Sequence, residues 1–201
     1  MQFEPERMER REVYYLLTSA VVPRPIAFVS TRGKDGSLNL APFSYFNAFS
    51  SDPPMIMFGP GRKRDGSPKD TLRNVEETGE FVVNVVVDGL EDAITLAAQV
   101  FDYGVSEFEK VGLTPVPSVK VKPPRVRETP VSMECKLVEV WRRHPGARYS
   151  IVIGEVVLFH VADEVLAGGV IDPYKLKPVG RLGGDLYSRT HEIFVRKRLD
   201  R

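Results

Sequence analysis

Three short apolar segments follow one another early in the chain with only turn signals between them. Residues 21–31 are rich in β-branched side chains and end at the turn sequence 33–36. A second extended stretch covers residues 38–51, and a third covers 55–58 before Gly59-Pro60-Gly61. Because parallel strands need a crossover helix between them, this arrangement predicts antiparallel strands and argues against a doubly wound fold.

Two helices are predicted further along the chain. Ser67 supplies a capping hydroxyl, Pro68 occupies the first helical position, and Asp70 follows three residues after the cap. Gly79 marks the end of this helix. Residues 91–101 then place apolar side chains at helical spacing. Few helical signals precede residue 66.

Further strands are predicted in the second half of the chain. Residues 81–87 have little polar alternation, which indicates burial on both faces, and residues 149–162 are long and almost wholly apolar. Residues 131–140 alternate, and a change of phase at Val138 and Val140 predicts a β-bulge. Residues 192–196 are strand-like. Many short strands with two or three helices predict a mainly β protein, a closed antiparallel barrel with added helices.

Length and charge limit the class of protein. The 201 residues suit a single domain over residues 1–201, with a charged lead-in at 1–12 and a tail at 188–201. The Pro-rich segment 114–130 is interpreted as a surface crossing within that domain. With 28 Lys and Arg against 27 Asp and Glu, the net charge is +1, which argues against nucleic-acid binding by bulk electrostatics.

Several kinds of site are not expected. Cys135 is the single cysteine, and His144, His160 and His191 are far apart in sequence, so no metal site is predicted. No run approaches the ~18 apolar residues that a membrane helix needs. The charged N-terminus does not resemble a secretory signal, and a cytoplasmic protein is expected. The signatures of Rossmann domains, P-loop proteins, α/β-hydrolases and zincins are missing.

Two segments have compositions that a cofactor could use. Residues 39–54 mix four aromatic side chains with serine and asparagine, which would suit a flat ring with a polar edge, although an ordinary aromatic strand with a polar end has the same composition. The helix start near Lys69 and Thr71 offers free N–H groups, an ammonium and a hydroxyl to a phosphate. An ordinary capped surface helix remains the alternative.

Four stretches of the sequence resemble those of a known family and occur in the same order: residues 24–31, 39–54, 69–86, and 151–161 together with 178–187. The family is the flavin reductase-like family of FMN-binding split barrels, and the resemblance is strongest to its flavoredoxin-like branch. The resemblance implies a six-stranded antiparallel Greek-key barrel that forms a homodimer and holds FMN near the dimer interface. It implies no catalytic residue. The cofactor-binding residues that it implies are Thr31, Ser44, Tyr45, Phe46, Asn47, Ser50, Lys69 and Thr71, with Arg24 and Arg181 as weaker candidates.

The resemblance implies an oxidoreductase that passes a hydride from NAD(P)H to FMN N5 and supplies an oxygenase or another acceptor. A flavoredoxin-type electron carrier with little nucleotide activity is the alternative, and a barrel without a cofactor is a third. The reductase branch carries Gly-Asp-His where this chain has Ala147, Arg148 and Tyr149, and Arg148 is expected to favour NADPH. His160 is interpreted as a hydrogen-bonded barrel residue rather than a catalytic one.

Overall fold

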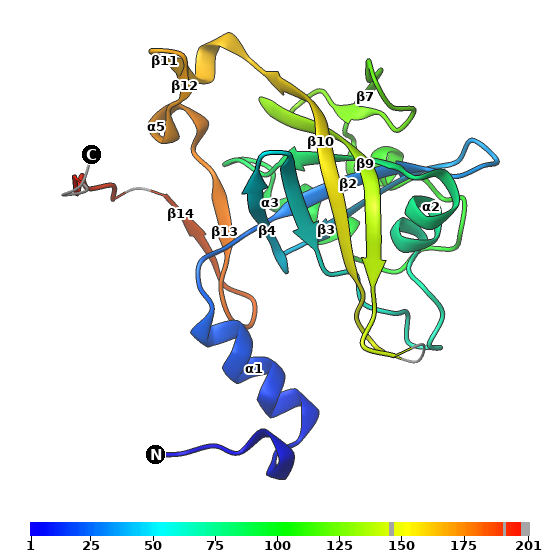
Figure 1. Ribbon diagram of the computed structural model, residues 1–201, viewed down its shortest axis with the longest axis vertical. Helices are drawn as coiled ribbons and strands as arrows, with labels where there is room; N and C mark the ends of the chain where they lie inside the picture. Colours follow the sequence, from blue (N-terminus) through cyan, green and yellow to red (C-terminus); the bar gives the residue numbers. More distant parts are fainter. Residues whose placement is uncertain (145–146, 191, 198–201) are drawn as a thin grey trace.

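The computed structural model describes residues 1–144, 147–190 and 192–197 (Figure 1). Its main element is an antiparallel sheet in the order β3-β2-β6-β9-β10-β5-β4. The strands of this sheet are β2 (Ala27–Arg32), β3 (Leu38–Phe43), β4 (Phe46–Ser51), β5 (Pro54–Phe58), β6 (Glu80–Val85), β9 (Val131–Trp141) and β10 (Ile151–Val161).

The sheet curls around one apolar core. Buried side chains from six strands and the partly buried Phe46 of β4 meet in a single cluster, which a flat sheet of this width could not achieve. Helix α2 (Asp70–Thr78) adds Leu72 and Val75 to the same cluster. A second core lies on the other side of β2 and β3, beneath α3 (Glu91–Ala97) and α4 (Glu107–Val111).

The remaining elements lie beside the barrel (Figure 1). A small sheet joins β1 (Arg24–Pro25), β13 (Val179–Arg181) and β14 (Tyr187–Arg189). The chain also forms η1 (Pro5–Arg7), α1 (Arg10–Ala20), the β7 (Pro115–Val116) and β8 (Arg125–Val126) pair, η2 (Asp163–Val165), the β11 (Leu166–Ala167) and β12 (Val170–Ile171) pair, and α5 (Pro173–Leu176).

The mainly β antiparallel class and the bulge are confirmed. Val138 is the extra residue on β9, because Glu139 pairs with Ile153 while Leu137 pairs with Gly154. The main sheet has seven strands rather than six. Residues 38–51, expected as one extended stretch, turn at Ser44 and Tyr45 to form two strands.

Three local predictions were wrong. Residues 10–20 form a helix, although few helical signals were seen before residue 66. Helix α2 begins at Asp70 with Lys69 at the N-cap, because Ser67 instead donates its hydroxyl to Asp65 within the preceding turn. Residues 192–197 have no regular secondary structure, and the last strand is β14.

No helix in the described part of the chain is long and apolar enough to cross a membrane.

Candidate functional site

A cavity of about 400 Å³ opens beside the turn that joins β3 to β4. We call it the aromatic pocket. Its walls come from the C-terminal end of α1, β1, the β3–β4 turn, β5 and the beginning of β10. The lining residues are Val21, Pro23, Arg24, Pro25, Ser44, Tyr45, Phe46, Asn47, Met57, Phe58, Gly59, Tyr149, Ser150 and Ile151. None of these residues is an acid or a histidine. The volume and the apolar lining with a few polar groups are typical of small-molecule sites.

Two tyrosines form one side of the aromatic pocket. The ring centroids of Tyr45 and Tyr149 are 5.6 Å apart. Each tyrosine packs against a glycine: a Cβ added to Gly59 would lie 3.1 Å from Cβ of Tyr45, and one added to Gly61 would lie 3.2 Å from a ring carbon of Tyr149. Burial raises the pKa of Tyr45, and the nearby hydroxyls of Tyr149 and Tyr14 raise it further.

Arg24 lines the same pocket but its guanidinium is already engaged. It is buried, and it donates to the carbonyls of Thr18, Val21 and Leu182 at 2.5, 2.8 and 2.9 Å. Its Nε also donates to Ser44 Oγ at 3.4 Å. Arg24 therefore fixes the β3–β4 turn relative to α1.

The other predicted turn residues lie close by. Ser44, Tyr45, Phe46 and Asn47 all line the aromatic pocket. Asn47 Oδ1 accepts the N–H of Ala48, which fixes the orientation of its amide. Ser50 lies further along β4, beyond a bulge in the pairing with β5, and does not line the pocket.

Arg181 pairs with Arg24 in the small sheet, but its side chain points to its own turn. It donates to the carbonyl of Gly184 at 2.6 Å and stacks on the ring of Tyr187 at 4.3 Å. It does not line the aromatic pocket.

Thr31 and Thr71 belong to a buried network beneath the start of α2. Asn39 donates its amide to Thr71 Oγ1 at 2.9 Å and to Thr31 Oγ1 at 3.2 Å. Asn74 donates to Thr31 Oγ1 at 3.0 Å. The network joins β2, β3 and α2. Asn39 and Asn74 were missed in the sequence, where Asn39 could have been noticed as a polar residue between two apolar ones in a strand.

Lys69 stands apart from this network. Its ammonium lies over the ring of Phe43, 5.7 Å from the centroid, and has no hydrogen-bond or ion-pair partner in the described part of the chain. Burial lowers the pKa of Lys69, and Asp70 only partly opposes this. Asp70 itself is paired with Lys63 at 2.6 Å. A half-buried ammonium without a partner, at the positive end of a nine-residue helix, suits an anion such as a phosphate.

The region around Lys69 also contains a buried carboxyl that sequence reasoning did not find. Lys69, Thr71, Asn39 and Glu107 line a small cavity of about 40 Å³. Glu107 accepts the N–H of Leu40 at 2.9 Å, and burial raises the pKa of Glu107.

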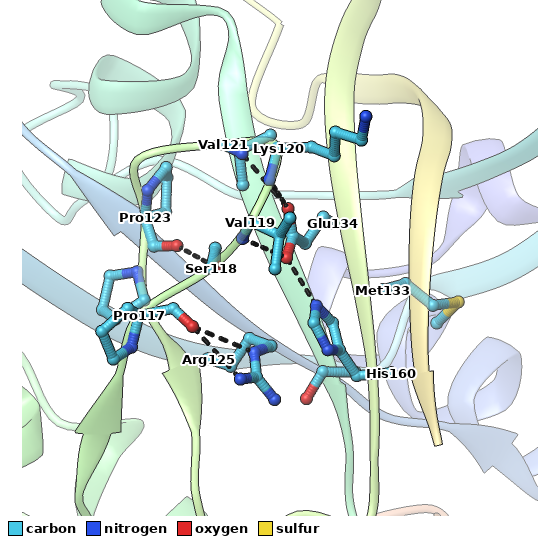
Figure 2. Close-up of polar contacts among 12 residues, drawn as sticks. Pro117, Ser118, Val119, Lys120, Val121, Pro123, Arg125, Met133, Glu134 and His160 are labelled. Atoms are coloured by element: carbon cyan, nitrogen blue, oxygen red, sulfur yellow. Dashed lines mark hydrogen bonds and ion pairs between the residues drawn. The ribbon is translucent and has the colours of Figure 1, made fainter.

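His160 lies away from the aromatic pocket, on β10. Figure 2 shows its ring pointing to the Glu134 carboxylate, with Nε2 2.5 Å from Oε1. The same carboxylate accepts N–H groups from Val119, Lys120 and Val121. The interpretation of His160 as a hydrogen-bonded barrel residue is confirmed.

His191 lies outside the described residues. Among those described, no three His, Cys, Asp or Glu side chains gather as a metal site would require.

Comparisons with known proteins identify the family of this chain. The model of the flavin reductase like domain matches residues 19–175. The chain belongs to the flavin reductase like domain family. Among solved structures, it is similar to nitrilotriacetate monooxygenase component B from Bacillus cereus, with 37% identity, 98% of each chain covered and a TM-score of 0.93.

Two further similar structures carry different names. The chain is similar to the 2-nitrobenzoate 2-nitroreductase of Pseudomonas fluorescens at 30% identity over 100% of this chain and 98% of that one, with a TM-score of 0.89. It is similar to flavoredoxin of Desulfovibrio vulgaris at 26% identity over 90% and 93%, with a TM-score of 0.78. The family is therefore one of flavin-binding split barrels, and it points to an oxidoreductase.

Proposed function

We propose that this protein is an NAD(P)H-dependent flavin reductase that uses FMN. The observation that carries the proposal is the half-buried Lys69 ammonium, which has no partner in the described residues and stands at the start of α2. One aromatic side chain separates it from the aromatic pocket: Phe43 contacts Lys69 on one side, and its ring is 5.1 Å from that of Phe58, which lines the pocket. The two places together suit a ligand with a phosphate and a flat ring.

In this proposal the aromatic pocket holds the isoalloxazine. The ring would lie among Ser44, Tyr45, Phe46 and Asn47, and Lys69 would hold the phosphate. Ser50, Arg24 and Arg181 remain candidates for outer contacts. The buried hydroxyls of Thr31 and Thr71 support the loop and the helix that form the site.

The chemistry that a bound flavin supplies is two-electron redox between a reduced nicotinamide and an acceptor. The protein needs only to orient the two rings and exclude water. The lining of the aromatic pocket suits this task, because it is mostly apolar and contains no carboxylate and no histidine. No residue is assigned a catalytic role.

The donor is proposed to be NADPH in preference to NADH. Arg148 is exposed, lies next to Tyr149 at the pocket rim, and carries a guanidinium that suits an additional phosphate. The acceptor is proposed to be an oxygenase or another protein, which is supported by the similarity to a monooxygenase component B. A homodimer is part of the proposal.

The alternative is an electron carrier that keeps FMN bound and reacts slowly with nicotinamides. It is favoured by the similarity to a flavoredoxin and by Tyr149, which cannot offer the charge of a histidine. Anaerobic mixing of the FMN-loaded protein with NADPH and with NADH separates the two. Rapid bleaching of the flavin band with NADPH supports the reductase, and inertness to both nucleotides supports the carrier. Failure to bind FMN contradicts both.

A further inference from the structure

A further cavity lies at the end of β9, and none of its lining residues belongs to the aromatic pocket or to the small cavity at Lys69. Its volume is about 720 Å³, which is within the range of small-molecule sites. The lining comes from β9 and the connection after it, from α2 and from the segment before α2. It includes Arg62, Leu72, Glu76, Glu139 and Trp141. We call it the Trp141 cavity.

Trp141 offers an open aromatic surface to this cavity. It is the single tryptophan of the chain, and it is 48% exposed. In the described part of the chain, neither an aromatic ring nor a cation is stacked on its indole. Aromatic side chains of this kind bind flat rings by stacking, nucleic-acid bases among them. The indole therefore suits a ligand with a flat ring.

Trp141 lies on the same face of the sheet as one wall of the aromatic pocket. In the pairing of β9 with β10, Trp141 is opposite Ile151, and Val140 is opposite Val152. Val140 and Val152 pack in the barrel core, and successive side chains of a strand point to opposite faces, so Trp141 and Ile151 both point outward. Opposed residues lie about 4.5–5.5 Å apart at Cα. Because Ile151 lines the aromatic pocket, the two cavities are neighbours on the outside of the barrel.

A carboxylate accompanies the indole on this face. Glu139 precedes Trp141 by two positions on β9, so the two side chains point the same way, and both line the cavity. Glu139 is exposed and has no hydrogen-bond or ion-pair partner in the described part of the chain, whereas Glu76 is paired with Arg142. A ring stacked on Trp141 thus has a hydrogen-bond acceptor beside it, which suits a ring that carries an amino group.

The end of the barrel at which this cavity opens is basic. Residues 59–68 and 141–150 contain six Lys and Arg and one Asp, although the whole chain has a net charge of only +1. The two segments are joined, because Arg62 Nε donates to the carbonyl of Ala147 at 2.9 Å. A local excess of positive charge attracts anionic ligands. The ligand that these features describe has a flat ring with an amino group and carries phosphate.

Adenosine phosphates have this chemistry, and adenine presents its amino group at the edge of its ring. In the proposed function, the nicotinamide of the donor meets the flavin in the aromatic pocket, and Arg148 faces the additional phosphate of NADPH. Arg148 belongs to the connection that runs from Trp141 to Tyr149 on the pocket rim. The adenosine half of the same nucleotide therefore extends toward Trp141.

We propose that the Trp141 cavity binds the adenine of NADPH and of NADH, with the ring stacked on Trp141 and its amino group donating to Glu139. The proposal rests on the proposed function, because it assigns the half of the nucleotide that does not react. It is separate from the selection of NADPH over NADH, since both nucleotides contain adenine.

Tryptophan fluorescence tests the binding directly, because Trp141 is its only source. In the FMN-loaded wild type, adenosine 2′,5′-bisphosphate should quench this fluorescence in a saturable way, whereas nicotinamide mononucleotide, which has no adenine, should not. Glu139→Ala should raise the Kd for adenosine 2′,5′-bisphosphate about fivefold or more. Glu164→Ala, which removes an exposed carboxylate from η2, is the matched control and should leave the Kd unchanged.

Kinetics test the indole itself by comparing Trp141→Leu with Phe159→Leu, which removes another exposed aromatic side chain, from β10. Trp141→Leu should raise KM for NADPH about fivefold or more without changing kcat, and Phe159→Leu should change neither. Reduced nicotinamide mononucleotide lacks adenine, so its oxidation by Trp141→Leu should equal that by the wild type.

The outcomes separate this proposal from the proposed function. If NADPH bleaches the flavin but adenosine 2′,5′-bisphosphate does not quench Trp141, or if Trp141→Leu keeps its KM for NADPH, the adenine site is overturned and the reductase stands. An equal loss with reduced nicotinamide mononucleotide also overturns it, because the variant then acts on the flavin pocket or the fold. Saturable quenching in a protein whose flavin neither nucleotide reduces supports the adenosine site and contradicts the reductase. Quenching with an unchanged Kd in Glu139→Ala contradicts the contact to the amino group.

Discussion

Gly154 of β10 lies directly against the ring of Phe81, which comes from β6 and is fully buried in the barrel core. A Cβ on Gly154 would overlap the Cζ edge of that ring and would also lie 3.3 Å from the carbonyl of Lys136. The glycine therefore leaves the space that a core aromatic fills. This is the physical reason for a glycine within an otherwise apolar central strand.

Gly154→Ala is expected to destabilise the protein by about 1–3 kcal/mol, the usual cost of overpacking a core. Urea unfolding gives the free energy. The control is a double-mutant cycle with Phe81→Leu, in which the smaller side chain should remove most of the cost of the alanine. Equal costs in both backgrounds would show that Phe81 is not the cause.

Glu134→Gln is expected to lower the free energy of unfolding by about 1–3 kcal/mol. Both carboxylate oxygens accept hydrogen bonds, and the amide would direct N–H groups toward the backbone donors of the loop or toward His160 (Figure 2). Glu128→Gln is the matched control, since its carboxylate is exposed, accepts the N–H of Thr114 and should cost less. Similar losses in the two variants would contradict this account.

The Glu134 carboxylate should also make the stability of the protein depend on pH. Burial alone would raise the pKa of Glu134, but the N–H groups of Val119 and Lys120 and the His160 ring outweigh it, and the pKa is lowered. The contribution of Glu134 is therefore present above the unfolded-state pKa of about 4.3 and is lost as the pH falls through the folded-state value. Unfolding curves between neutral and acidic pH should show the difference between wild type and Glu134→Gln shrinking as the pH falls.

The architecture follows from patterns that the sequence displays. Turn signals without intervening helices indicated antiparallel strands, and the change of phase at Val138 indicated the bulge that the pairing of β9 with β10 contains. These features depend on local backbone preferences and on which side chains face the core. Both can be judged over a few residues at a time.

What the sequence did not predict depends on partners far along the chain. In helix α1 the one buried residue is Thr18, whereas Tyr14 to Leu17 are exposed, so the apolar pattern does not indicate what this helix packs against. The network of Asn39, Thr31 and Thr71 needs three elements to be folded first. Lys69 and the aromatic segment were chosen from their composition, but only the fold places the Lys69 ammonium over the ring of Phe43 in that segment.

Arg148→Ala is expected to reduce the preference for NADPH over NADH without changing the affinity for FMN. Arg148 is exposed and directly precedes Tyr149, and its guanidinium has no hydrogen-bond partner in the described residues, so it is able to pair with an additional phosphate. Losing such a contact should lower kcat/KM for NADPH about tenfold or more. Arg143→Ala, an exposed arginine on the same connection, is the control. An unchanged ratio of the two kcat/KM values would remove Arg148 from nucleotide selection.

Lys69→Ala is expected to weaken FMN binding by roughly 1–3 kcal/mol, or about 5- to 150-fold in Kd, because it removes a charge-assisted contact to the phosphate. Riboflavin has the same ring without the phosphate, so its affinity should be unchanged. Flavin-fluorescence titration measures both. Lys34→Ala, an exposed lysine at the turn between β2 and β3, controls for the loss of one positive charge. Thr71→Ala should also weaken FMN binding by roughly 1–3 kcal/mol, because it removes the buried hydroxyl that accepts the amide of Asn39 and so disturbs the start of α2, and it should lower stability as well. If Lys69→Ala weakened FMN and riboflavin equally, the ammonium would act on the ring or on the fold, and the phosphate would have to lie elsewhere.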